Sequence, residues 1–185
     1  MRTHRVHIPL LLLTAAIALG GAPSASASTV CASADAVPFA ISTAKLASAA
    51  SCLVNQERAR YRLPSFRLNH RLAQAATGHA SDMVSRDYFS HDTSGGGSFV
   101  DRILKSGYTS RNAFPSLGED LAWGSGALGS ARSIVDAWMQ SPGHRANILN
   151  RKFRDMGMGV SLGTPDGDST AGATYALDFG SGGRR

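Results

Sequence analysis

The chain has 185 residues, a length that suits one ordinary domain. Hydrophobic residues make up 43% and charged residues 17%, which excludes a disordered or collagen-like chain and predicts a single globular core. The formal net charge is +6, but the basic residues are scattered and the sequence has no nucleic-acid reader motif. We therefore expect no nucleic-acid partner.

The first 27 residues have the pattern of a secretory signal peptide. Arg2 and Arg5 precede an apolar run at residues 8–19, and residues 25–27 form the small-x-small pattern at which signal peptidase cuts. The run is shorter than the roughly 20 apolar residues that span a membrane. We expect cleavage and a secreted, extracellular monomer without a stable membrane span, its net charge lowered from +6 to +4 by loss of the two arginines.

Cys31 and Cys52 are the two cysteines of the chain. In an oxidising compartment two thiols have one intramolecular pairing available, so we predict a disulfide between them. It would tie an N-terminal arm at residues 28–43 to the first helix. The domain itself is expected at residues 44–181, with a tail at residues 182–185.

Apolar residues at helical spacing predict the first two helices. The first covers residues 41–61, with Pro64 beyond its end. Asn69 is placed to cap the second helix, whose apolar stripe includes His79. A histidine on such a stripe is more often a hydrogen-bonded core residue than a ligand, so we interpret His79 as part of the core.

Capping patterns predict the later helices. Ser98 and Asp101 have the spacing of a capping box at the start of a short third helix. Ser130 can cap a fourth helix, which Pro142 ends or kinks. A small helical turn is expected at residues 144–149.

The C-terminal part changes to a period of two, which predicts strands. Apolar residues alternate with small ones at residues 156–162, a polar loop follows, and residues 173–179 form a second strand of an antiparallel hairpin. A further strand is expected at residues 117–123. Helices followed by adjacent strands predict an α+β fold rather than a wound parallel sheet.

The sequence lacks the nucleophile elbow, zinc helix, phosphate loop and Cys-x-x-Cys signatures of common enzymes. Three ionisable residues at the ends of predicted elements stand out instead: His91, Glu119 and His144. Two neutral imidazoles and a carboxylate suit a zinc ion and leave an open fourth position. Spacing alone does not bring them together, and separate surface histidines are the alternative.

Several ordered segments carry a family resemblance: residues 53–58 (LVNQER), 79–83 (HASDM) leading to 89–91 (FSH), 118–122 (GEDLA), 138–149 (WMQSPGHRANIL) and 175–180 (YALDFG). Together they resemble the CAP superfamily of cysteine-rich secretory, antigen 5 and pathogenesis-related 1 proteins (SCP domain), and most closely its bacterial secreted members. The resemblance covers about residues 51–180. It implies an α-β-α sandwich with a mixed or antiparallel sheet between helices, and a central cleft where His91, Glu119 and His144 hold a divalent metal, often zinc.

Two residues depart from the family pattern. Ser141 stands where many eukaryotic members have a second glutamate, so the site has three candidate ligands and we expect low zinc occupancy. Asp120 stands where asparagine commonly follows the glutamate. It would either add a negative charge or hydrogen-bond a turn, and we favour the turn.

For three further side chains near these motifs, the sequence allows two interpretations of the role of each. Arg145 would contact an anionic ligand beside the cleft or cap nearby carbonyls, and the sequence leaves both open. Trp123 and Trp138 would line a ligand groove or lie in the core, and the inward stripe around Trp138 favours the core for that residue.

The resemblance implies a secreted ligand-binding or effector module for a lipid, a sterol or a cell-envelope component, with the metal organising the site. The alternative is a zinc-assisted hydrolase of a peptide, ester or glycan, with Glu119 as metal ligand or candidate general base. One carboxylate cannot readily act both as metal ligand and as general base. A complete hydrolase mechanism would need Asp120 to turn inward. A structural envelope protein is the second alternative.

Overall fold

The computed structural model describes residues 30–113, 115–167 and 171–182. The predicted signal peptide lies outside these residues, as do the first two residues of the predicted arm and the last three of the tail. The helices are α1 (Thr43–Arg60), α2 (His70–Ser85), α3 (Phe99–Lys105), α4 (Ala131–Gln140) and α5 (Pro142–Ile148). The strands are β1 (Arg67–Leu68), β2 (Leu117–Ser125), β3 (Asp155–Leu162) and β4 (Gly172–Gly180).

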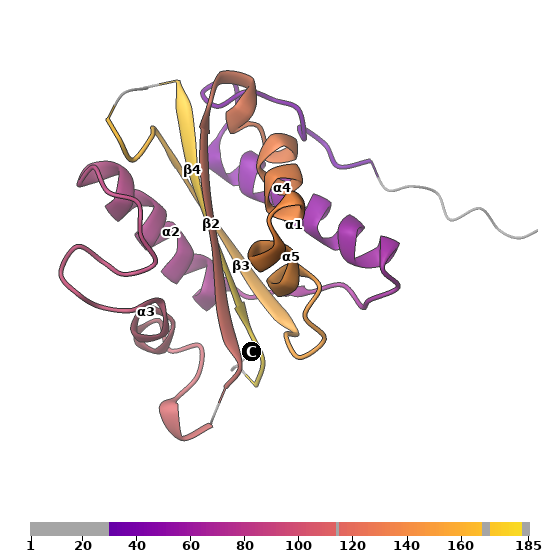
Figure 1. Ribbon diagram of the computed structural model, residues 1–185, viewed down its shortest axis with the longest axis vertical. Coiled ribbons are helices and arrows are strands. Elements are labelled where there is room, and N and C mark those ends of the chain that lie inside the picture. Colours follow the sequence, from indigo (N-terminus) through magenta and orange to yellow (C-terminus); the bar gives the residue numbers. More distant parts are fainter. Residues whose placement is uncertain (1–29, 114, 168–170, 183–185) are drawn as a thin grey trace, which may run out of the picture.

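The four described strands form one mixed sheet in the order β1-β3-β4-β2. Strands β2 and β3 both run antiparallel to β4, and the two-residue β1 runs parallel to β3. Helices α2 and α3 cover one face of the sheet, and α1, α4 and α5 cover the other (Figure 1). The predicted α-β-α sandwich, the hairpin and the extra strand near residue 117 are confirmed.

Local capping explains where the helices begin. The Asn69 side chain accepts hydrogen bonds from the first backbone N–H groups of α2, and Ser98 with Asp101 forms the predicted capping box of α3. Helix α1 begins at Thr43, two residues later than predicted, because Ser42 caps it. Pro142 neither kinks α4 nor lies in it: α4 ends at Gln140, and the proline opens α5 at a position where its missing N–H costs nothing.

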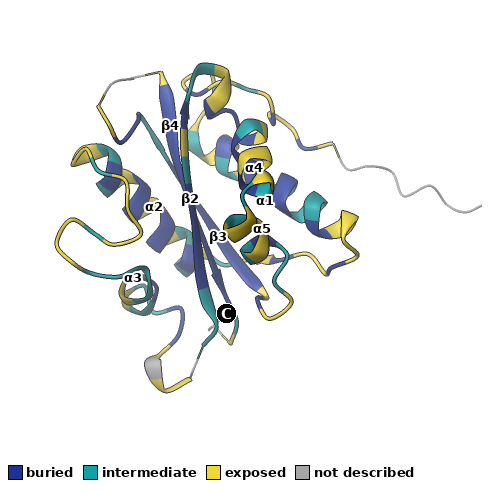
Figure 2. Ribbon diagram, in the orientation of Figure 1, coloured by how far each residue is buried: buried dark blue, intermediate teal, exposed yellow. Residues whose placement is uncertain are grey.

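The main core lies between the sheet and the layer of α1 and α4. Trp138 is fully buried there and its indole N–H donates to the Leu121 carbonyl at 3.1 Å, so it is a core residue as predicted. Trp123 on the edge strand is 39% exposed. Strand β4 is buried along its whole length at the centre of the sheet (Figure 2).

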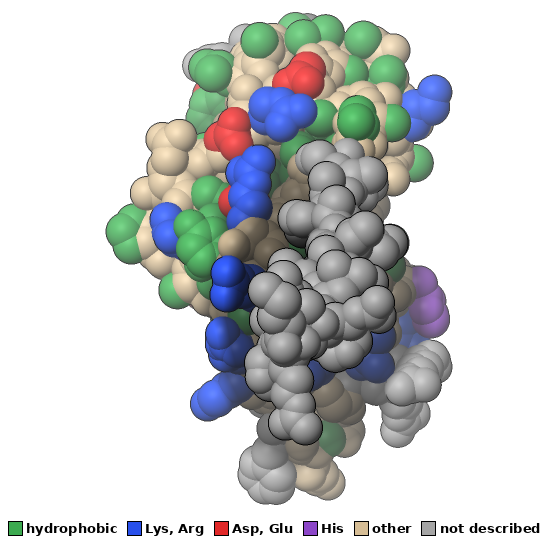
Figure 3. All heavy atoms as spheres, turned by 90° about the vertical axis from the view of Figure 1, so that its right-hand side faces the viewer, with side chains coloured by type: hydrophobic (Ala, Val, Ile, Leu, Met, Phe, Trp, Pro, Cys, Tyr) green, Lys and Arg blue, Asp and Glu red, His purple; other side chains and the backbone are tan. Residues whose placement is uncertain are grey.

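The predicted disulfide between Cys31 and Cys52 is present. It holds the arm against α1, and the backbone N–H of Arg132 on α4 donates to the Ala34 carbonyl at 2.9 Å. On the face formed by α1 and α4, lysine and arginine side chains are spread along the molecule with hydrophobic and uncharged groups between them (Figure 3).

Candidate functional site

Glu119 lies in the third position of the edge strand β2, and its side chain is completely buried. Oε1 accepts a hydrogen bond from His91 Nδ1 at 2.8 Å, and Oε2 accepts one from Arg102 on α3 at 2.6 Å. A carboxylate only accepts, so the proton of this His91 pair is on Nδ1. The hydrogen bond to Glu119 raises the pKa of His91 above its usual value.

Asp178 on β4 is paired in register with Glu119 and is 1% exposed. Burial raises its pKa well above the ordinary range, and the negative charge of Glu119 raises it further. Burial and the neighbouring Glu119 both favour the protonated form of Asp178. Within this pair, Glu119 is the residue that Arg102 and His91 contact.

Asp120 lies on the opposite face of the sheet from Glu119, because successive side chains of a strand alternate. It is fully buried, and Asn147 on α5 donates to its Oδ1 at 2.8 Å. Burial raises the pKa of Asp120 to about 8, against the lowering effect of the Asn147 hydrogen bond. The expected turn interaction of Asp120 is therefore wrong: the residue is inside a strand, and its partner belongs to a helix.

His144 lies in the first turn of α5 and is partly buried. Burial lowers its pKa, and a positive charge on His91 lowers it further, so the two imidazoles are within electrostatic range. Ser141 is the residue between α4 and α5, directly before this turn. Arg145 donates to the Tyr61 hydroxyl at 2.7 Å and lies over the Tyr61 ring, at the end of α1.

Three residues that the sequence did not place at the site hold it together. His79 is 1% exposed, and its Nε2 lies 2.8 Å from the Ser90 carbonyl, which fixes the loop that carries His91. This confirms His79 as a hydrogen-bonded core residue. Asn147 follows His144 by three residues on a helix, a spacing that would have indicated a shared face. Nothing in the sequence indicates that Arg102 reaches Glu119.

No set of three or more His, Cys, Asp or Glu side chains within the described ranges is arranged to hold a metal ion. Both Glu119 oxygens already accept hydrogen bonds, so direct coordination by Glu119 would cost its contact with His91 or Arg102. A histidine that binds metal commonly donates its other N–H to a carboxylate. If a metal were bound here, the contacts of Glu119 would suit a position behind His91 better than direct coordination.

Residues 53–176 match the model of the family described as the cysteine-rich secretory protein family (CAP). Two curated proteins of Bacillus subtilis are similar over part of their length. The uncharacterized protein YkwD is 34% identical over 107 residues, 58% of this chain and 39% of its own. The uncharacterized membrane protein YlbC is 32% identical over 108 residues, 58% of this chain and 29% of its own. The chain thus matches well under half of either relative.

Solved structures share the fold. An extracellular protein of Bacillus anthracis containing an SCP domain is 26% identical with a TM-score of 0.58, over 75% of this chain and 43% of its own. An outer surface protein of Borrelia burgdorferi is 19% identical with a TM-score of 0.62, over 76% of this chain and 95% of its own. At that identity the second likeness concerns the fold alone.

Proposed function

Because this chain belongs to the cysteine-rich secretory protein (CAP) family, we propose that it works outside the cell as a ligand-binding module for a lipid, a sterol or a cell-envelope component. The description of one structural relative, 26% identical, as an extracellular protein supports export. Among the described residues, no helix combines the length and apolar character needed to cross a membrane.

The observations that carry this proposal are the burial and the hydrogen bonds of the Glu119 side chain. A general base must come within hydrogen-bond reach of the proton it takes. The Glu119 side chain is 0% exposed, and each oxygen accepts a charge-assisted hydrogen bond from a separate cationic or ionisable group. This arrangement suits a carboxylate that orients His91 and favours binding over hydrolysis.

A divalent metal such as zinc fits this proposal as an organiser of the site, held by His91 and His144. When bound, it would polarise an oxygen of the ligand. Glu119 fixes the ring of His91 through Nδ1, which leaves Nε2 for coordination. Structural zinc sites have four protein ligands and catalytic sites three, so a two-histidine site predicts weak binding and low occupancy.

The test compares binding with turnover in the same samples. Palmitate, cholesterol and muramyl dipeptide are titrated by calorimetry into the wild type and the His91→Ala/His144→Ala variant, and release of product from p-nitrophenyl esters, casein and cell-wall glycan is followed. Saturable binding of one probe, weakened in the variant and without turnover, supports the proposal. Turnover that disappears in Glu119→Gln supports the hydrolase. The absence of both binding and turnover supports the structural alternative.

A further inference from the structure

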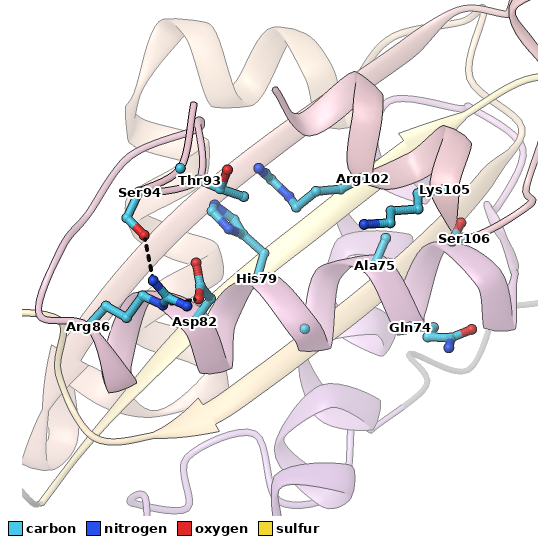
Figure 4. A pocket seen from close by; sticks show the side chains of 12 residues that line it. Gln74, Ala75, His79, Asp82, Arg86, Thr93, Ser94, Arg102, Lys105 and Ser106 are labelled. Carbon is cyan, nitrogen blue, oxygen red and sulfur yellow. Dashed lines mark hydrogen bonds and ion pairs between the residues drawn. The ribbon is translucent and has the colours of Figure 1, made fainter. Parts of the chain in front are cut away.

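A cavity of about 520 Å³ lies between α2 and α3, beside the candidate site. This volume is within the range of sites for small molecules. Figure 4 shows the side chains of His79 from α2 and of Arg102 and Lys105 from α3 pointing into the space between the two helices. His91 and His144 are not among its lining residues.

The lining carries a net positive charge. Arg86 is neutralised by Asp82, with 2.8 Å between Nε and Oδ1. Arg102 is paired with Glu119, a carboxylate that is not part of the lining. Lys105 forms no ion pair within the described part of the chain, so its charge is available to a negatively charged ligand.

Two residues of the lining have buried nitrogen atoms without a hydrogen-bond partner in the described ranges. These atoms are Nε and Nη1 of Arg102 and Nδ1 of His79. Native proteins satisfy such atoms with protein, water or ligand groups. Arg102 can only donate, whereas His79 donates from Nε2 to the Ser90 carbonyl, so its Nδ1 is an acceptor in the neutral ring. Burial lowers the pKa of His79 and favours that neutral form.

We propose that this cavity binds a small hydroxylated organic anion, such as an acidic sugar or a sugar phosphate. Its acid group pairs with Lys105 and with the unpartnered N–H groups of Arg102, and a hydroxyl donates to Nδ1 of His79. Ala75 and Gly78 bring no long side chain into the α2 wall and leave room for the carbon skeleton. This ligand site is separate from the two-histidine site of the proposed function.

Four probes of similar size test the chemistry: gluconate, glucose 6-phosphate, glucose and hexanoate. Calorimetry or NMR titration of the wild type is expected to show binding of at least one hydroxylated anion with a Kd of about 1 mM or lower. Glucose lacks the charge and hexanoate lacks the hydroxyls, so both should bind at least about tenfold more weakly, a loss on the scale of one missing interaction. The two anions distinguish a carboxylate from a phosphate ligand. Equal binding of gluconate, glucose 6-phosphate and glucose, or no binding of either anion, overturns the proposal.

Two variants locate the binding. A Cβ atom at Gly78 would meet no atom within 4 Å, so Gly78→Leu can fill the cavity without a backbone clash, and Gly78→Ala is its matched control. Gly78→Leu should abolish anion binding, and Gly78→Ala should retain it. Lys105→Gln should weaken binding at least about fivefold, while Lys45→Gln on α1 should not. Zinc binding should be unchanged in all four, which separates this site from the proposed function. Wild-type affinity in both Gly78→Leu and Lys105→Gln would refute the cavity as the site.

Discussion

At the scale of single residues, Arg58 shows how a buried charged side chain can hydrogen-bond main-chain carbonyls from separate segments. It is 2% exposed, and its guanidinium donates to the main-chain carbonyls of Pro64 at 2.8 Å, Ile148 at 2.7 Å and Asn150 at 3.1 Å. Burial lowers its pKa to about 10, so it stays charged at neutral pH. A cation at the C-terminal end of α5 also complements the helix dipole.

We predict that Arg58→Met lowers the free energy of unfolding by about 3 kcal/mol, because the change leaves buried carbonyl groups without donors. Arg60→Met, at an exposed position of the same helix, should change it by less than about 0.5 kcal/mol. Urea unfolding measures both. Equal effects of the two substitutions would show that Arg58 contributes no more than a surface charge.

His91 and Glu119 lead to a prediction about zinc. If Glu119 acts by orienting His91, Glu119→Gln should weaken zinc binding by about 10- to 100-fold without abolishing it. His91→Ala/His144→Ala should abolish binding, and His70→Ala, at an exposed histidine of α2, should leave it unchanged. Isothermal titration at neutral pH measures these affinities. Loss of all binding in Glu119→Gln would instead make the carboxylate a direct ligand.

At the scale of elements, α2 lies directly on β3 because β3 has glycines on that face. A Cβ atom at Gly157 would come within 2.0 Å of the Ala73 nitrogen, and one at Gly159 within 2.2 Å of the Ala76 carbonyl carbon. Contacts this short involve helix backbone, which cannot move aside as a flexible side chain can. The alternation of small and large residues in β3 thus sets the distance between helix and sheet, and with it the position of His79.

We predict that Gly159→Ala lowers the free energy of unfolding by at least about 2 kcal/mol, since one methyl group must displace α2 from the sheet. Gly143→Ala in α5, where a Cβ atom would meet nothing within 4 Å, serves as the control and should be close to neutral. Chemical denaturation of both variants measures the effect. A loss of unfolding free energy well below about 2 kcal/mol for Gly159→Ala would mean that α2 shifts easily on the sheet.

At the scale of the whole molecule, the disulfide joins the arm to the layer of α1 and α4. The linked cysteines are 21 residues apart. Closing a loop of this length contributes about 3 kcal/mol in the chain-entropy account. We predict that Cys31→Ser/Cys52→Ser loses about that amount of unfolding free energy. Because the bond lies on the other face of the sheet from the α2–α3 cavity, gluconate binding by the folded variant should be unchanged. A smaller loss in urea unfolding would show that packing alone holds the arm.

The helices and the three long strands of this protein could be predicted from the sequence alone and in the right order, whereas the two-residue β1 could not. Asn69, Ser98 and Ser130 mark helix starts, and the alternation at residues 156–162 marks a strand, because caps and periodicity act within a few residues of chain. Two cysteines allowed only one internal disulfide. His91, Glu119 and His144 stood out at the ends of predicted elements, and the family resemblance then implied that they share one cleft.

The partners of these side chains depend on how distant segments pack and could not be predicted from the sequence. Glu119 meets Arg102 from 17 residues away, and Arg58 meets Ile148 from 90 residues away, contacts that no local pattern encodes. Asp120 was misjudged because its role depends on which helix covers its face of the sheet. Burial, charge state and pairing depend on segments distant in the chain meeting in space, and that is a property of the packed molecule rather than of any short stretch of sequence.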